Sequence, residues 1–228
     1  MRQGFTLIEL MIVIAIIAII ASIAIPNLLE SRITANEAQS ATSLKSAFFP
    51  GQVQFQSGGY IDVDSDGRGS FASHPSYLAG TTGAATSLII GPAKALTLLP
   101  SQYNNAGGQA SGAWTNGTTS TLASAKAGAY DYSFYLANAT GSMPTAEDNT
   151  EIYWVGIACP TNTQGNEARR AFAVSETGSL FQTKGTVTNA NTTQAKLVLG
   201  GGATSQMFSA GLTAPAANNA ANASPYAK

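Results

Sequence analysis

The N-terminus of this chain carries an almost unbroken apolar segment, residues 5–26, with a single charge, Glu9, near its start. A run of about 20 apolar residues is long enough to cross the hydrocarbon core of a bilayer as a helix. An ionised carboxylate inside such a helix costs about 2.5 kcal/mol or more. Glu9 therefore predicts a specific partner at this depth, in addition to membrane anchoring.

A short charged leader, residues 1–4, precedes the apolar segment. An ordinary secretory signal has its small-residue cleavage site on the far side of the apolar region. Here the small residue Gly4 comes first, so cleavage after Gly4 would remove Arg2 and leave the helix attached. Arg2 on the precursor agrees with the preference for positive charge on the cytoplasmic side.

Residues 4–9 read Gly-Phe-Thr-Leu-Ile-Glu and resemble the class III leader of type IV prepilins and of the related type II secretion pseudopilins. The resemblance implies that a prepilin peptidase cuts between Gly4 and Phe5 and methylates the new amine of Phe5. It implies that Glu9 pairs with the Phe5 amine of a neighbouring subunit during assembly. It also implies that Pro26 is the helix-loosening proline of the transmembrane half.

The residues themselves leave two partners open for Glu9. After removal of the leader, the α-amine of Phe5 is the positive group at membrane depth, and it lies one helical turn from Glu9. A pair within one subunit is therefore one alternative, and a pair between subunits, which would fix the register of assembly, is the other. A simple signal anchor is the alternative for the whole segment, but an anchor has no use for Glu9.

Beyond residue 29 the pattern predicts that the helix continues, as an amphipathic half over residues 30–56 that ends near Phe55. Pro26 should kink this helix, and Pro50 should bend it or end it early. The side chains expected to face a globular domain are Ile33, Leu44 and Phe48. Those expected to be partly exposed are Glu30, Arg32, Glu37 and Lys45.

The rest of the chain predicts an antiparallel sheet over residues 129–183, after a variable connection over residues 57–128 with at most a short helix or two. Strands are expected at residues 129–137, 151–159, 170–175 and 179–183, and alternation places Tyr130, Tyr132, Phe134 and Leu136 on one face. The fold class is thus α+β, resembling the type IV pilin fold: a long helix packed against three or four strands. Residues 184–228 are of low complexity and too poor in large apolar residues to form a core of their own, although residues 195–199 could add an edge strand.

One acidic segment has the opening of a calcium loop: Asp62, Asp64 and Asp66 alternate before Gly67. The pattern is incomplete, because the twelfth position, where an EF-hand needs Glu, is Ser73. The alternative is a solvated acidic turn. Calcium is the one cofactor that the sequence suggests.

No catalytic arrangement is found in the sequence, and we expect the protein not to be an enzyme. His74 is the single histidine, expected to be structural or exposed, and Cys159 is the single cysteine, expected to be a buried small hydrophobe. The net charge of -1 gives no basic excess that would indicate nucleic acid as the main partner.

The resemblance therefore implies a structural subunit of a type IV pilus or pilus-like extracellular filament. The precursor would sit in the inner membrane with one span, and its partners would be the prepilin peptidase, an assembly platform and copies of itself in a helical filament. Adhesion, motility and DNA uptake are roles that such a filament serves. The alternatives are a pseudopilin of a type II secretion system and, from another class, a membrane-tethered periplasmic binding protein that never polymerises.

Overall fold

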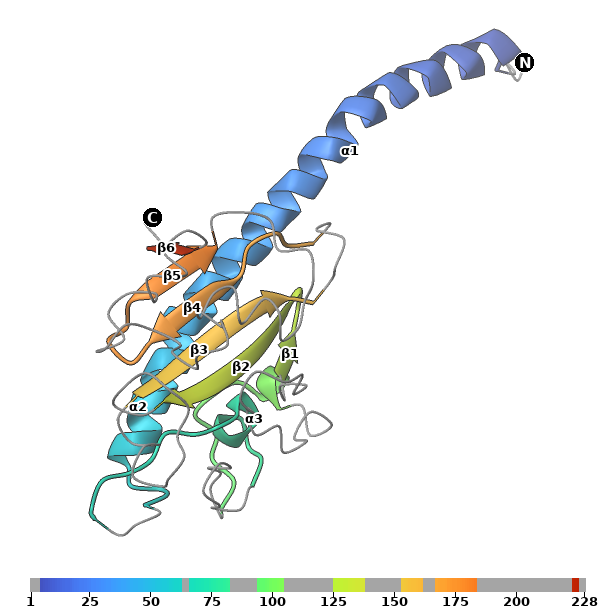
Figure 1. Ribbon diagram of the computed structural model, residues 1–228. Helices are drawn as coiled ribbons and strands as arrows, with labels where there is room; N and C mark the ends of the chain where they lie inside the picture. The colour runs from blue at the N-terminus through green and yellow to red at the C-terminus, as the bar shows by residue number, and fades with distance from the viewer. Residues whose placement is uncertain are drawn as a thin grey trace, which may run out of the picture.

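The structure, a computed structural model, describes residues 5–62, 66–82, 94–104, 125–137, 153–161, 167–183 and 223–225. A long helix crosses one face of an antiparallel sheet and extends well beyond it toward the N-terminus (Figure 1). The predicted α+β class, with a long N-terminal helix against a sheet, is confirmed.

The helix is continuous from Leu7 to Ser57. It consists of α1 (Leu7–Ser43), the π-helical turn η1 (Leu44–Phe48) and α2 (Phe49–Ser57). Gly58 and Gly59 end it, because Gly59 takes a positive φ of 59° that other residues rarely adopt. The helix thus passes the expected end near Phe55 by two residues.

Pro50 does not end the helix, and the π-helical turn before it gives the physical reason. A proline has no N–H, and its ring crowds the carbonyl four residues earlier in an α-helix. Here the chain widens just before Pro50, so that the N–H of Phe49 donates to the carbonyl of Leu44, five residues back. Pro50 then lies in the first turn of α2, where a missing N–H costs little.

Pro26 lies inside α1, which continues through it. Figure 1 shows α1 as a curved helix, bent along the part that extends beyond the sheet. A proline removes one intrahelical hydrogen bond and is a common cause of helix bending.

The sheet is larger than the three or four strands predicted: the strand order is β1-β2-β3-β4-β5-β6, each strand antiparallel to the next. Five strands belong to the predicted sheet or lie directly before it, and a sixth comes from the C-terminal region. Two of the six are three residues long and carry no alternating pattern, which is why the sequence did not indicate them. The strands are β1 (Ala125–Ala127), β2 (Tyr130–Ala137), β3 (Tyr153–Pro160), β4 (Phe172–Ser175), β5 (Leu180–Thr183) and β6 (Ala223–Pro225).

The predicted alternation along β2 is confirmed for Tyr130, Tyr132 and Phe134, which are all buried on the face toward the helix. The side chain of Leu136 and residues 195–199 lie outside the described part of the chain. The turn between β4 and β5 joins two of the predicted strands, and its Gly178 has a φ of 76°, a conformation that suits glycine.

The connection after the helix includes the short helix α3 (Pro75–Leu78) and the 3-10 turn η2 (Ser101–Tyr103). His74 begins α3 as its N-cap, and its Nδ1 accepts the backbone N–H of Ser76 at 3.1 Å. Of the two expectations for His74, structural or exposed, the structure shows the first, with its side chain buried. Strand β1 lies inside the segment that the sequence treated as connection.

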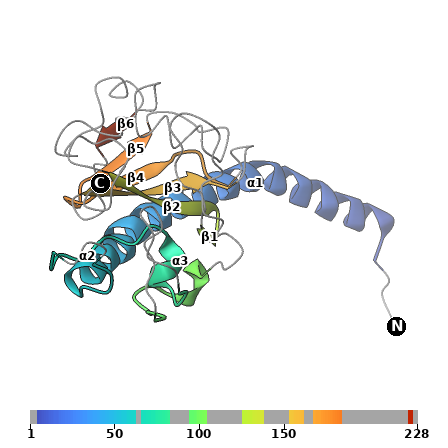
Figure 2. The same ribbon diagram turned by 60° about the horizontal axis from the view of Figure 1, so that its bottom comes forward.

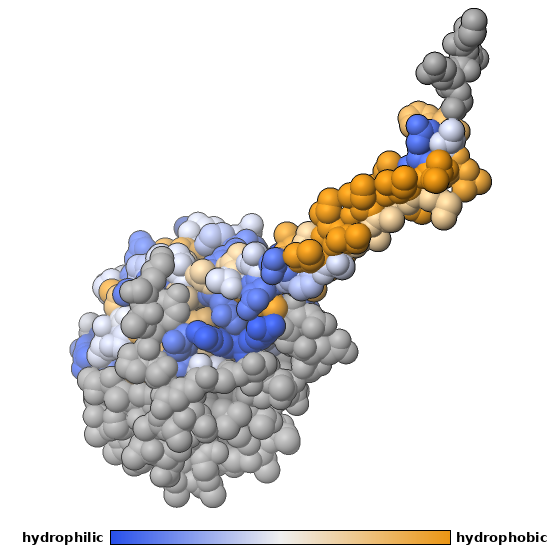
Figure 3. All heavy atoms as spheres, turned by 90° about the horizontal axis from the view of Figure 1, so that it is seen from above, coloured by the Kyte–Doolittle hydropathy of each residue, from blue (hydrophilic) through white to orange (hydrophobic). Residues whose placement is uncertain are grey.

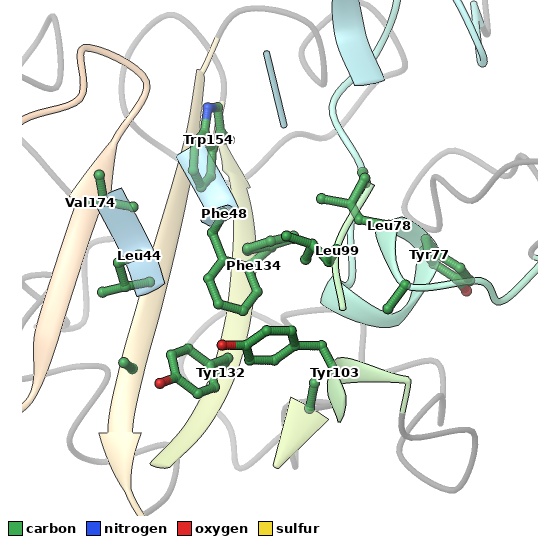
Figure 4. Close-up of a cluster of buried hydrophobic side chains, with 14 of the residues drawn as sticks. Leu44, Phe48, Tyr77, Leu78, Leu99, Tyr103, Tyr132, Phe134, Trp154 and Val174 are labelled. Carbon is green, nitrogen blue, oxygen red and sulfur yellow. The ribbon is translucent and has the colours of Figure 1, made fainter. Parts of the chain in front are cut away.

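The core lies between the helix and the sheet, where Leu44, Phe48 and Phe55 are completely buried. The ring centroid of Phe48 lies 4.9 Å from that of Tyr132 and 4.7 Å from that of Tyr103. Figure 4 shows these three side chains in one cluster. Ile33, Leu44 and Phe48 therefore face the domain as predicted. Truncation of such a buried aromatic side chain typically costs about 3–5 kcal/mol.

Candidate functional site

The N-terminal half of the helix makes no internal core: its large apolar side chains, from Phe5 to Leu29, are between 49% and 91% exposed. Figure 3 shows this half as an apolar rod that leaves the polar surface of the domain. A helix that is apolar all round requires a membrane or a packed array of other helices around it. By length and composition this helix could cross a membrane.

The first turn of α1 is a capping box formed by Thr6 and Glu9. The Glu9 carboxylate oxygen Oε2 accepts the backbone N–H of Thr6 at 2.8 Å and its hydroxyl at 2.7 Å. In return, the Thr6 hydroxyl accepts the backbone N–H of Glu9 at 3.3 Å. The capping box therefore gives hydrogen-bond partners to the N–H groups of Thr6 and Glu9 and holds the carboxylate at the N-terminus, where the helix dipole favours a negative charge.

Sequence reasoning identified Glu9 but missed Thr6. The spacing Thr-x-x-Glu before an apolar run is the recognised sequence pattern of a capping box and could have revealed it. Both hydrogen bonds from Thr6 go to Oε2, so they leave the second carboxylate oxygen for another donor. Gly4 lies outside the described residues, whereas Phe5 is described and is 91% exposed.

The apolar half also satisfies its own hydroxyl group. Ser22 donates from Oγ to the carbonyl of Ile19 at 2.7 Å, which removes an unpaired polar group from an apolar surface. Small residues that allow helices to approach closely recur along the same half at Ala15, Ala18, Ala21 and Ala24. This segment is therefore suited to lie in lipid and to pack against copies of itself.

Where the helix meets the domain, Glu37 holds the segment that leads into β4. Its Oε1 accepts the backbone N–H groups of Arg169 and Arg170 at 3.1 and 3.2 Å. One residue earlier, the Asn36 amide donates to the carbonyl of Glu167 at 2.8 Å. These contacts fix the direction in which the apolar half leaves the domain.

The acidic segment forms a turn with internal hydrogen bonds. Oδ2 of Asp62 accepts the N–H of Gly67 at 3.0 Å, and Oδ1 of Asp66 accepts the N–H of Arg68 at 2.7 Å. Asp64, the middle residue of the predicted calcium site, lies outside the described residues. Within the described part of the chain, no group of three His, Cys, Asp or Glu residues is placed to hold a metal ion. Calcium binding stays a prediction.

Cys159 lies on β3 and is buried, as the sequence predicted for a small hydrophobe. Burial, with a smaller contribution from the nearby Asp131 carboxylate, raises the pKa of its thiol to about 12. At neutral pH the thiol is therefore protonated and a poor nucleophile.

These features define an α+β domain that carries a long, exposed, apolar N-terminal helix, which could cross a membrane and has one charged residue, Glu9, near its start. The family model for the prokaryotic N-terminal methylation motif matches residues 1–25. The chain is 49% identical over 63 residues to the type IV wide pilus major component PilA4 of Thermus thermophilus, a match that covers 28% of this chain and 44% of that protein. It is also 49% identical over 54 residues to the type IV major pilin protein PilA of Myxococcus xanthus, which covers 24% of each chain.

The matched region thus spans less than half of either curated relative. No solved structure matches the chain. The N-terminal segment of the chain is thus similar to that of two type IV pilins and carries the prokaryotic N-terminal methylation motif.

Proposed function

We propose that this protein is a structural subunit of a type IV pilus or pilus-like extracellular filament. The observation that carries the proposal is the exposed apolar half of α1, which begins with the Thr6–Glu9 capping box. Two environments suit this segment: the bilayer before assembly and a bundle of identical helices afterwards. Repetition of one contact that does not close on itself generates a helical filament.

In the proposed precursor, the apolar half spans the inner membrane and the domain lies on its outer side. A prepilin peptidase would cut after Gly4 and methylate the Phe5 amine. The amine of one subunit would then lie opposite Glu9 of its neighbour, because a carboxylate in an apolar environment is strongly stabilised by a cation. An assembly platform would draw the subunit out of the lipid.

Glu9→Gln tests the intersubunit pairing separately from the capping box. Glutamine also completes a capping box, so the first turn of the helix should persist. The variant loses only the negative charge. We expect normal membrane insertion and cleavage, but at least a tenfold lower yield of sheared filaments on immunoblots and in electron micrographs. Filaments at the wild-type level would contradict the proposed pairing.

Gly4→Leu tests the leader assignment. A bulky residue before the cut should leave an uncleaved precursor that still inserts in the membrane, as N-terminal mass spectrometry would show. Normal cleavage of this variant would contradict the assigned processing site. The conservative variant Gly4→Ala is the matched control, since it keeps a small residue at the same position.

The two alternatives predict different results for these variants. A type II secretion pseudopilin would also require Glu9, but its loss would stop protein secretion. Both relatives described above are named as major pilins, which favours a pilus. A tethered binding protein would keep its activity in Glu9→Gln, because it does not polymerise. Assays of adhesion, motility and DNA uptake in a strain without filaments would show which of these roles the filament serves.

A further inference from the structure

The first charges after the apolar half of α1 are Glu30 and Arg32, which have opposite signs. Residues 10–29 carry no charged side chain, so these two residues mark the point where the apolar half joins the domain. Both side chains are exposed. Figure 2 shows α1 extending toward its N-terminus, away from the other labelled elements. A neighbouring copy of the chain can therefore reach both charges.

Within one subunit, neither charge is neutralised. Neither side chain has an ion-pair or hydrogen-bond partner among the described residues. Side chains three or four positions apart are neighbours on a helix, but no basic residue lies at these distances from Glu30 and no acidic residue lies at them from Arg32. Glu37, the next charge along the helix, holds the backbone of the segment before β4 instead. The subunit thus presents one unpaired charge of each sign at the base of its domain.

The two charges point to different sides of the subunit. Ile33 is buried and marks the side of α1 that faces the domain. At 3.6 residues per turn, Glu30 lies about 60° from Ile33 on one side and Arg32 about 100° from it on the other. Along the helix axis the two residues are only about 3 Å apart. A stagger of less than one turn between neighbouring copies therefore brings Arg32 of one copy level with Glu30 of the next.

The helix surface between the two charges allows a close approach. Ser31 and Ala35 lie on the side away from Ile33, and both are small and exposed. Ser31 donates from Oγ to the carbonyl of Asn27 at 2.9 Å, and Thr34 donates from Oγ1 to the carbonyl of Glu30 at 3.0 Å. These hydroxyl groups are satisfied by their own helix and need no partner from outside. Small residues let neighbouring helices come close together.

We propose that Arg32 of each subunit pairs with Glu30 of the next subunit along the filament, which rests on the filament function proposed above. Charge complementarity identifies the partner as a second copy of this chain, because one side of the helix carries the charge that the other side needs. A contact between two different patches of identical copies does not close on itself and continues along the array. The planar guanidinium group can bind a carboxylate through two hydrogen bonds, which fixes its orientation.

The pair contributes to the register of the array more than to its stability. An exposed ion pair adds little free energy, whereas like charges brought together are clearly unfavourable. Two copies that met through the same side would place Glu30 against Glu30, or Arg32 against Arg32. Only the contact between different sides brings opposite charges together. The two residues thus select the contact that continues and disfavour the one that closes.

Charge reversal and its rescue test the pairing in the full-length chain. We expect Glu30→Lys and Arg32→Glu each to lower the yield of sheared filaments at least about fivefold, because each places like charges in contact. The double variant restores opposite charges, so its yield should return to within about twofold of the wild type. Leader cleavage and membrane insertion should be normal in all three variants. Lys45→Glu, a reversal at another exposed position of the helix, is the matched control and should assemble normally.

A zero-length crosslink tests the contact itself. Arg32→Lys keeps the positive charge and adds an amine that a carbodiimide couples to a carboxylate in direct contact. In filaments of this variant we expect a ladder of coupled subunits on a denaturing gel, with position 30 of one copy joined to position 32 of another in the peptide mass spectra. Addition of Glu30→Gln removes the carboxylate and should abolish this link. Filaments of Arg32→Lys without the link would overturn the pairing.

The outcomes separate this pairing from the filament function on which it rests. A wild-type chain that forms no filaments would overturn the proposed function, and the pairing with it. Wild-type filaments together with undiminished yields in both single variants would overturn the pairing alone. Single variants that fail at membrane insertion, and that the double variant does not rescue, would also overturn it and would indicate lipid phosphates as the partner of Arg32.

Discussion

Thr6 and Glu9 hold each other at the first turn of α1, with the Thr6 hydroxyl 2.7 Å from the carboxylate oxygen Oε2. A carboxylate transferred into an apolar environment loses its hydration, and hydrogen bonds to the charged form restore part of that loss. The Thr6 hydroxyl and backbone N–H supply two such bonds before any partner subunit is present. Glu9 can therefore stay ionised in the membrane at a lower free-energy cost than a carboxylate without these hydrogen bonds.

Thr6→Val should impair assembly by removing one of these donors and the N-cap. Loss of an N-cap side chain typically costs about 0.5–2 kcal/mol, and the carboxylate also loses a hydrogen bond. We expect a several-fold lower filament yield with normal cleavage, measured by immunoblot of sheared and cell-bound fractions. Thr6→Ser, which keeps the hydroxyl, should assemble normally. Equal yields for the valine and serine variants would refute a role for the hydroxyl.

Gln52→Ala should destabilise the domain strongly. The buried Gln52 side chain donates to the carbonyl of Ala72 at 2.7 Å and accepts its N–H at 2.9 Å, which ties α2 to the segment before α3. Removal leaves two buried backbone groups unpaired, at roughly 1–3 kcal/mol each before relaxation. We expect the free energy of unfolding to fall by about 2–4 kcal/mol in denaturant titrations of the full chain in detergent. The exposed neighbour Gln54→Ala is the control and should stay within about 0.5 kcal/mol of the wild type.

Glu37→Ala should loosen the attachment of the β4 lead segment to the helix. The variant removes the acceptor of two backbone N–H groups, those of Arg169 and Arg170. Both donors can reach solvent, so we expect a loss of only about 1–2 kcal/mol of unfolding free energy. Hydrogen exchange at residues 167–171 should increase. Glu37→Gln keeps an acceptor oxygen, so hydrogen exchange should increase less than in Glu37→Ala. A larger increase in Glu37→Gln than in Glu37→Ala would show that the charge, and not the hydrogen bonds, holds the segment.

Stability should fall as pH rises through 7 because of Glu176, in the turn between β4 and β5. Burial raises the pKa of this half-buried carboxyl group to about 7 from its ordinary 4.5, and within the described part of the chain its buried Oε2 has no hydrogen-bond partner. The folded chain thus binds the proton more tightly than the unfolded chain. The stability that this tighter proton binding gives to the folded chain is fully present below about pH 4.5 and is lost as the pH rises through 7.

Glu176→Gln isolates this contribution. The variant should match the wild type near pH 4.5 and exceed its unfolding free energy at pH 8 by about 1–2 kcal/mol, after allowance for solvent screening of a half-buried group. Denaturant titrations of both proteins at pH 4.5, 6 and 8 provide the measurement. A constant difference across this pH range would contradict the raised pKa.

The strongest local patterns were sufficient to predict the helix and the central strands. Residues 5–26 form an apolar run long enough for a membrane-spanning helix, and Tyr130, Tyr132 and Phe134 alternate with the period of a strand. Strands β1 and β6 were not predicted, because Ala-Lys-Ala and Ala-Ser-Pro have no strand preference and pair only where a longer neighbour offers an edge. Long-range pairing of that kind cannot be read from a local window.

The candidate site was predicted only in part, because a local sequence pattern indicates some of its residues and not others. Glu9 was found because a charge in an apolar run is conspicuous, but Thr6 was not, because a threonine there does not disturb the pattern. Of the two effects expected of Pro50, a bend or an early end, the early end is wrong: a π-helical turn before Pro50 gives its ring the space it needs, and the helix continues. The contact between Glu37 and the segment before β4 joins residues more than 130 positions apart, so no motif could indicate it.

The large apolar side chains of the N-terminal half of α1 are exposed and take no part in the core of the described domain. The free energy of polymerisation and the free energy of unfolding therefore depend on different residues, whereas in many oligomers they depend on the same ones. Substitutions in residues 5–29 should change polymerisation while the unfolding curve of the solubilised subunit stays constant, and substitutions in the core should do the reverse. Effects on distant, independent sites add, so a double variant with one change in each region should show the sum of the two single effects. The chain can therefore vary its outward-facing domain without retuning the part that polymerises.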